Sequence, residues 1–73
     1  MTIFTTTACP HCKNIKNFCN ERGITFTEKN TDTDEDAFAD IVGEGFQSVP
    51  VIKYKGKYEL VHSVDEFKSF IGM

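Results

Sequence analysis

Hydrophobic positions along the first third of the chain follow two different periods. Ile3 and Phe4 lie among threonines in residues 1–6, a pattern typical of a short strand. The apolar positions after Pro10 then recur at helical spacing, and Pro10 itself suits a first helical turn because its missing N–H would have no partner there. Gly23 is expected to end this helix, since glycine commonly follows the last helical turn.

The middle of the chain predicts a second strand and a second helix. Residues 24–28 alternate apolar and polar side chains with period two, as in a strand with one buried face. Asp34 heads an acidic first turn in a helix expected over residues 33–42, where the positive end of the helix dipole favours negative charge. Three apolar side chains are expected to form its buried stripe: Phe38, Ile41 and Val42. Gly43 and Gly45 then stop the helix and open a loop.

The last third of the chain predicts a hairpin followed by a helix. Residues 49–52 and 57–61 are strand-like segments that flank a turn centred on Lys55-Gly56. Ser63, three residues before a glutamate, matches a capping box at the start of a helix. The apolar face of that helix is expected to consist of four side chains: Val64, Phe67, Phe70 and Ile71.

The order of these elements, β-α-β-α-β-β-α, indicates the fold class. The first β-α-β unit predicts two parallel strands joined by a right-handed crossover, and the hairpin adds two antiparallel strands. We therefore expect an α/β protein with a thioredoxin-like arrangement, in which helices flank a four-stranded mixed sheet. The chain has no linker, repeat or low-complexity segment, so residues 1–73 are expected to form a single domain.

Charge and hydropathy exclude some functions. The chain carries a formal charge of −3, and its acidic residues concentrate between Glu28 and Glu44, which argues against nucleic acid as a partner. Basic residues follow the first cysteines instead, at Lys13, Lys16 and Arg22. No apolar run approaches the roughly 20 residues of a membrane span, and the N-terminus has no signal-peptide pattern. We therefore expect a cytoplasmic protein without a membrane partner. We also expect the chain to be a monomer.

The candidate chemistry lies in the motif Cys9-Pro10-His11-Cys12. The chain has three cysteines, and an odd number in a cytoplasmic protein does not indicate a framework of structural disulfides. The motif opens the first helix, where unpaired backbone N–H groups and the helix dipole stabilise a thiolate. Cys9 is therefore the expected nucleophile, and Cys12, one turn further in, is the expected resolving thiol. His11 can favour the thiolate through a positive charge or through a hydrogen bond.

Metal binding is the alternative function, because zinc and iron–sulfur sites use the same spacing of cysteines. A structural zinc site usually has four protein ligands, and the chain offers them only if Cys19 and His62 join the two motif cysteines. Cys19 shares the apolar stripe of the first helix, so we expect it in the core. The position of the motif directly after a strand, with no second CxxC, favours redox chemistry without a bound metal.

The chain resembles the glutaredoxin family at two motifs. The cysteine motif at residues 9–12 resembles the Cys-Pro-Tyr-Cys of dithiol glutaredoxins, and Ser48-Val49-Pro50 resembles their Thr-Val-Pro. The resemblance implies thiol–disulfide oxidoreductase activity, with glutathione as a co-substrate and no bound cofactor. It also implies that Pro50 is cis and faces the reactive cysteine, and that Val49 pairs with the main chain of the substrate.

The same resemblance implies further substrate contacts. The loop before the cis-proline faces the site in glutaredoxins, so Gln47 and Ser48 are expected to contact substrate. Asp65 matches the acid that follows a Gly-Gly pair before the last helix of the family, although a His-Ser pair replaces Gly-Gly here. Thr6 occupies the position, three residues before the first cysteine, at which glutaredoxins usually carry a lysine that binds glutathione.

The short length of the chain is similar to that of two glutaredoxin subgroups. These are the small glutaredoxins of bacteriophages and the glutaredoxin-like hydrogen donors of ribonucleotide reductase. The resemblance therefore implies disulfide-containing proteins, such as ribonucleotide reductase, as substrates. Some members of these subgroups take electrons from thioredoxin reductase instead of glutathione, so both electron donors stay open.

Overall fold

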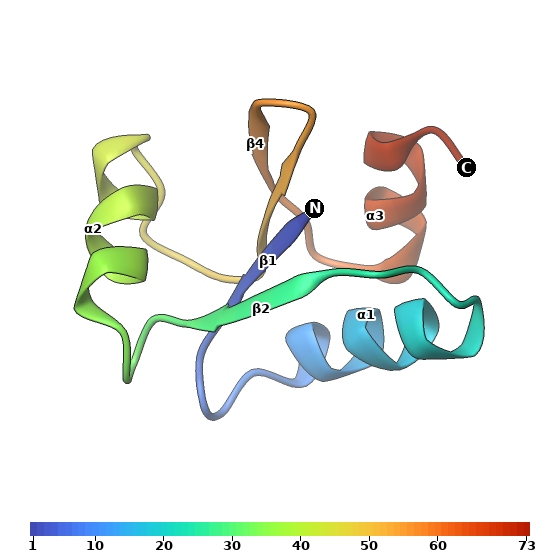
Figure 1. Ribbon diagram of the computed structural model, residues 1–73, viewed down its shortest axis with the longest axis horizontal. Coiled ribbons are helices and arrows are strands. Elements are labelled where there is room, and N and C mark those ends of the chain that lie inside the picture. Colours follow the sequence, from blue (N-terminus) through green and yellow to red (C-terminus); the bar gives the residue numbers. More distant parts are fainter.

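The computed structural model describes residues 1–73. Its elements follow in the predicted order (Figure 1): β1 (Thr2–Thr5), α1 (Pro10–Glu21), β2 (Thr27–Asn30), α2 (Glu35–Gly43), β3 (Val51–Tyr54), β4 (Lys57–Leu60) and α3 (Val64–Ile71). The strands form one four-stranded sheet in the order β2-β1-β3-β4. β1 and β2 run parallel and the other two pairs are antiparallel, which confirms the predicted thioredoxin-like fold. None of the helices combines the length and the apolar character needed to span a bilayer.

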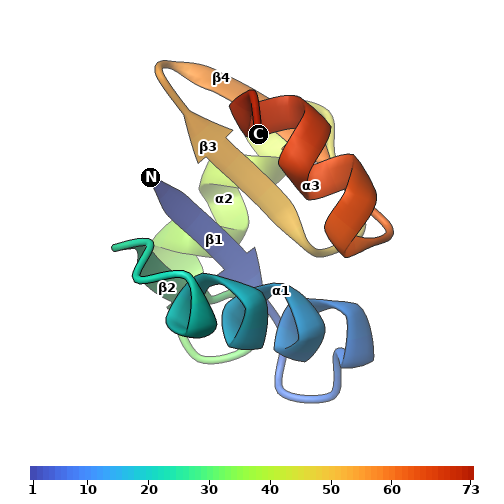
Figure 2. The ribbon, with the colours of Figure 1, turned by 90° about the vertical axis from the view of Figure 1, so that its right-hand side faces the viewer.

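Alternate side chains of the central strands divide the core into two layers. Ile3 of β1 lies opposite Ile52 of β3, and both pack under α1 and α3, whereas the neighbouring pair, Phe4 and Val51, packs under α2. Figure 2 shows α1 and α3 in front of the sheet and α2 behind it. The cluster under α1 and α3 has six buried residues: Ile3, Ile15, Cys19, Ile52, Val61 and Phe67. The cluster under α2 has four: Phe4, Ala37, Ile41 and Val51.

Local sequence signals shape the C-terminal third as predicted. Ser63 caps the start of α3 as predicted, since its Oγ accepts from the backbone N–H of Glu66 at 3.2 Å. The Glu66 carboxylate reaches one residue further back than in a standard capping box and accepts from the backbone N–H of His62 at 3.2 Å. In the hairpin turn, Lys55 (φ 51°) and Gly56 (φ 79°) both adopt left-handed conformations. Two such residues are typical of a two-residue turn whose twist matches that of the flanking strands.

Two strands begin later in the chain than the hydrophobic pattern predicts. β2 starts at Thr27, because the backbone N–H of Ile24 still donates to a carbonyl of α1 at 2.9 Å. The alternation that suggested an earlier strand reflects Ile24 and Phe26, which are half-buried and pack against the core under α1 and α3. β3 begins at Val51, two residues later than predicted, since Pro50 has no N–H to contribute to a sheet.

The buried stripe of α2 also differs from the prediction. Ala37 and Ile41, one turn apart, are buried against the sheet. Phe38 and Val42 are 56% and 45% exposed, so their prediction as core residues is wrong. The small side chain of Ala37 lets α2 pack closely on Phe4, and the next position along the helix then points away from the sheet.

Candidate active site

The two motif cysteines lie between β1 and α1 and form a disulfide. Cys9 is the N-cap of α1: its backbone is extended, and its Sγ accepts a hydrogen bond from the backbone N–H of Cys12 at 3.1 Å. Pro10 occupies the first turn, where a missing N–H leaves no partner unsatisfied. Cys9 is half-buried, whereas Cys12 is only 1% exposed. Cys9 is therefore the more accessible cysteine of the pair.

Hydrogen bonds to the β2–α2 connection fix the loop that leads into the motif. The backbone N–H of Thr7 donates to the Asp32 carboxylate at 2.9 Å, and the Asn30 side-chain amide donates to Thr7 Oγ1 at 3.4 Å. The backbone N–H and the hydroxyl of Thr31 both donate to the Thr5 carbonyl, at 2.7 and 2.9 Å. A segment distant in sequence is therefore hydrogen-bonded to the end of β1 and to the loop before the motif.

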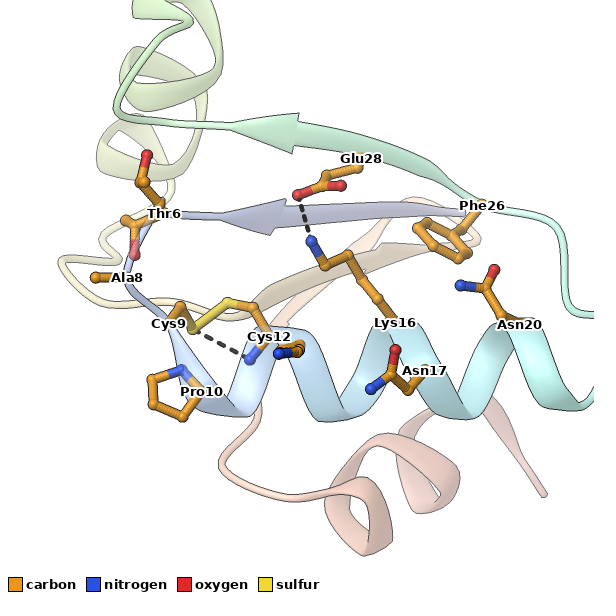
Figure 3. A pocket seen from close by; sticks show the side chains of 12 residues that line it. Thr6, Ala8, Cys9, Pro10, Cys12, Lys16, Asn17, Asn20, Phe26 and Glu28 are labelled. Carbon is orange, nitrogen blue, oxygen red and sulfur yellow. Dashed lines mark hydrogen bonds and ion pairs between the residues drawn. A yellow bond between two sulfur atoms is a disulfide. The ribbon is translucent and has the colours of Figure 1, made fainter.

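A groove of about 730 Å³ runs from the disulfide along α1 and beside β2 (Figure 3). Lys16 and Glu28 form an ion pair within it, with 2.9 Å between Nζ and Oε2. The buried hydroxyl of Thr5 donates to the same Glu28 oxygen at 2.9 Å. The hydrogen bond from Lys16, assisted by the one from Thr5, holds the pKa of Glu28 below its ordinary value. The groove thus contains an ionised carboxylate that is already paired.

A second hollow, of about 350 Å³, lies between α2 and the loop before β3. Gln47, Ser48 and Val49 line it, and Thr6 lines both this hollow and the groove. The Val49–Pro50 peptide bond is cis, and Pro50 is buried. The structure thus brings three of the residues proposed from sequence to one hollow, next to the loop that leads into the cysteine motif.

Other residues singled out from sequence lie outside both hollows. Asp65 lines a separate hollow between β4 and α3, together with Glu59. His11 is exposed in the first turn of α1 and lines neither the groove nor the second hollow. His62 is exposed as well, and its Nδ1 lies 3.2 Å from the Glu66 carboxylate. The structure therefore places Asp65 and His62 away from both hollows, whereas His11 lies between the two cysteines on the outer face of the first turn of α1.

The third cysteine belongs to the core. Cys19 is fully buried under α1 and α3, as the sequence predicts, and burial raises the pKa of its thiol. No group of three or more His, Cys, Asp or Glu side chains is placed to hold a metal ion. The zinc set considered from sequence would require Cys19 to leave the core, so the residues present do not fit a structural zinc site.

The sequence alone does not identify several residues of the site. The pairing of Lys16 with Glu28 depends on where β2 begins, which the hydrophobic pattern misplaces. In the sequence, Asp32 belongs to the acidic stretch before the second helix. In the structure, its carboxylate accepts a hydrogen bond from the backbone N–H of Thr7 in the loop before the motif. Phe38 reads as a core residue but lines the second hollow. The one feature of the sequence that points to the groove is the pair Lys13 and Lys16, which follow the motif directly and line the groove in the structure.

Comparison with known proteins places the chain among redox proteins of this fold. Residues 1–59 match the family model described as Glutaredoxin. The crystal structure of a mutant of the thioredoxin-like protein BC3987 superposes with a TM-score of 0.87 at 15% sequence identity, covering 97% of this chain and 92% of that chain. At this identity the similarity bears on the fold alone. No curated protein matches the sequence.

Proposed function

This chain belongs to the glutaredoxin family, and on that basis we propose that it is a dithiol oxidoreductase that reduces protein disulfides or glutathione mixed disulfides through Cys9 and Cys12. One observation carries the proposal: the backbone N–H of Cys12 donates to Cys9 Sγ at the start of α1. Backbone N–H groups and the helix dipole stabilise negative charge at this position, so Cys9 suits the role of attacking thiolate. His11 in the first turn would add to this effect when protonated.

The proposed reaction consists of two successive thiol–disulfide exchanges. The Cys9 thiolate attacks one sulfur of the substrate disulfide, a mixed disulfide forms, and the other substrate sulfur leaves as a thiolate that takes up a proton. The Cys12 thiolate then attacks the Cys9 sulfur and releases the second substrate sulfur, also as a thiolate. The substrate gains two electrons in total, and the chain returns to its Cys9–Cys12 disulfide.

A thiol reductant must reopen this disulfide after each cycle. We propose glutathione or thioredoxin reductase as the electron donor, by analogy with the short glutaredoxins that the chain resembles. Two glutathione molecules would be oxidised to one glutathione disulfide per cycle, whereas thioredoxin reductase would deliver two electrons from NADPH. The uncharged Thr6, in place of the usual lysine, favours the reductase.

The loop before β3 is the proposed docking site for the substrate main chain. The backbone N–H and C=O of Val49 form no hydrogen bond within the chain, so they are free to pair with an extended segment, as in strand addition. Gln47 and Ser48 line the same hollow and are proposed as polar contacts. Asp65, which lies outside this hollow, is proposed to contact only substrates that extend to α3.

The proposed setting is the cytoplasm, where the chain would act as a monomer on protein disulfides such as that of ribonucleotide reductase. A reducing compartment supports this, because a dithiol enzyme needs a supply of thiol reductant. The net charge of −3 supports protein or thiol partners rather than nucleic acid.

Two assays on one preparation test the proposal. The first couples the chain to glutathione and glutathione reductase, and the second couples it to thioredoxin reductase and NADPH, with a protein disulfide as substrate in both. We expect turnover in at least one system, its loss in Cys9→Ser, and a trapped mixed disulfide in Cys12→Ser. If neither system works and Cys9→Ser leaves general disulfide reduction unchanged, the proposed function is wrong.

Metal analysis of the anaerobically purified chain addresses the alternative. A metal-binding module would carry metal in stoichiometric amount and lose it in Cys12→Ser. We expect no such metal, because Cys19 is buried in the core and the remaining side chains form no ligand group. A Cys12-dependent metal or an iron–sulfur absorption band would overturn the proposal that this is purely an oxidoreductase.

A further inference from the structure

The exposed face of α2 carries apolar side chains that no part of the chain covers. Phe38 is 56% exposed and Val42, one turn later, is 45% exposed. The only other large hydrophobic side chain with comparable exposure is Met73, at the C-terminal end. Phe38 and the half-buried Phe46 line the second hollow together with Val49, so the apolar surface continues directly into the proposed docking loop. An apolar surface in this position is typical of a binding site.

The second hollow carries negative charge, which disfavours an anionic ligand. Asp32 is the only charged residue that lines it, and no lysine or arginine does. Further acids follow at the start of α2, where Asp34 caps the helix and Glu35 and Asp36 form its first turn. The two lysines near the motif line the groove along α1 instead. A ligand carboxylate beside Val49 would therefore meet repulsion, whereas a neutral apolar group would not.

The position of the hollow indicates what would occupy it. Thr6 lines both the hollow and the groove that contains the disulfide, so the hollow adjoins the place where a substrate sulfur meets Cys9. An extended segment paired with Val49 would direct alternate side chains to the same side at intervals of roughly 7 Å. A side chain close to the substrate cysteine would then lie over Phe38 and Phe46.

We infer that this hollow binds a large apolar side chain that flanks the cysteine of a protein substrate, so that the chain prefers protein disulfides with apolar flanks to glutathione disulfide. The inference rests on the proposed function, because it concerns the substrate of the same thiol–disulfide exchange. The occupant is a segment of the protein that carries the disulfide, and the electrons follow the route given above. Glutathione is the poorer substrate because its carboxylates would approach Asp32 and the acidic start of α2.

Three disulfides of matched chemistry test the inference, with dithiothreitol as the reductant so that the natural electron donor plays no part. Two are disulfide-linked dimers of one short peptide, with leucine two residues before and two residues after the cysteine in the first and aspartate at the same positions in the second. The third is oxidised glutathione. We expect kcat/KM for the leucine peptide to exceed that for the aspartate peptide by about tenfold, mainly through KM.

Two variants locate the preference in the hollow. Phe38→Ala should reduce the leucine preference toward unity, and Phe38→Lys should shift it toward the aspartate peptide and glutathione disulfide. Met73→Ala removes an equally exposed hydrophobic side chain at the far end of the chain and should keep the full preference. Because Phe38 is exposed, its variants are expected to fold, which circular dichroism checks.

The outcomes separate the inference from the proposed function. A wild-type chain that reduces none of the three disulfides contradicts the proposed function itself. Equal kcat/KM for the two peptides, or the same change in Phe38→Ala and Met73→Ala, overturns the inference and leaves the exchange reaction standing. If Phe38→Ala keeps the leucine preference in the dithiothreitol assay and instead slows reduction of the chain in a separate assay with thioredoxin reductase and NADPH, the hollow serves the electron donor and the inference is wrong.

Discussion

The Sγ of Cys9 accepts a hydrogen bond from the backbone N–H of Cys12 at 3.1 Å, and thus caps the helix that contains its own redox partner. Oxygen atoms do the same at the other two helices, where Asp34 accepts from the Ala37 N–H and Ser63 accepts from the Glu66 N–H. Sulfur therefore takes a structural position that is usually filled by a side-chain oxygen. The same N–H group is in place to stabilise a negative charge on Cys9.

Two variants of Cys9 distinguish its role as a helix cap from its role in thiol–disulfide exchange. In the presence of a reductant, Cys9→Ser keeps a capping side chain and should unfold at nearly the same urea concentration as the wild type, although it cannot carry out exchange. Cys9→Ala loses the cap and should be less stable by about 1 kcal/mol. Urea unfolding of the three reduced proteins measures this. Equal stability of the two variants would show that residue 9 does not cap α1.

Cys19 should not react with thiol reagents in the folded chain. Its pKa is raised by burial, so the thiol stays protonated and covered. Iodoacetamide added to the reduced protein near neutral pH should modify Cys9 and leave Cys19 unmodified until urea is added, which peptide mass spectrometry detects. Rapid labelling of Cys19 without urea would contradict its place in the core.

The raised pKa of Cys19 also makes the free energy of unfolding depend on pH. A thiol whose pKa is higher in the folded than in the unfolded chain contributes full stability below the unfolded value, about 8.5, and loses it as the pH rises toward the folded value. The free energy of unfolding should therefore decline on the alkaline side, and Cys19→Ala should lose this part of the decline.

The ion pair between Lys16 and Glu28 should contribute modestly to stability. The two side chains are 30% and 36% exposed, so Glu28→Gln is expected to cost only about 0.5 kcal/mol at neutral pH. The pKa of Glu28 is lowered in the folded chain, chiefly by Lys16. The contribution is therefore present above the unfolded pKa, about 4.3, and lost as the pH falls through the folded value.

Urea unfolding of Glu28→Gln and the wild type at several pH values measures this contribution. The difference between them should shrink toward zero in acid. Glu59→Gln is the matched control, since Glu59 is exposed and forms no ion pair. An equal loss in both variants would mean that the cost comes from the charge in general and not from the pair.

Phe67 and Phe38 should differ sharply in their effect on stability. Phe67 of α3 is fully buried, and its ring meets Phe18 of α1 edge to face, so Phe67→Ala should cost about 3–5 kcal/mol. In a chain of this size such a loss removes most of the free energy of unfolding. Phe38→Ala should change it by less than about 0.5 kcal/mol. Thermal unfolding compares them, and a large loss in Phe38→Ala would contradict its exposure.

The features that the sequence predicts correctly depend on neighbouring residues. The position of the cysteine motif at a helix start follows from Pro10 and the preceding strand, and the hairpin turn follows from Lys55 and Gly56. The helix cap at Ser63 is likewise a local signal. Each of these involves residues only a few positions apart, so the pattern of residues along the chain is sufficient to specify it.

The features that the sequence does not predict depend on how distant segments pack. The start of β2 is decided by the end of α1 and by pairing with β1, and neither is visible in the alternation of residues 24–28. The rotation of α2 is decided by the fit of Ala37 against Phe4, which sends Phe38 outward. The hollow beside Val49 depends on that rotation, so it could not be predicted from the sequence.

The strand order leaves β2 and β4 at the two edges of the sheet, and both carry charges of either sign. Glu28 and Lys29 lie on β2, and Lys57 and Glu59 lie on β4. A strand from another copy could pair with these edges only by stripping water from the charges, which discourages self-association. The unpaired backbone of Val49 lies instead in a loop beside the motif. The charged edges thus disfavour backbone pairing between copies, whereas the proposed pairing with substrate is confined to the loop beside the motif.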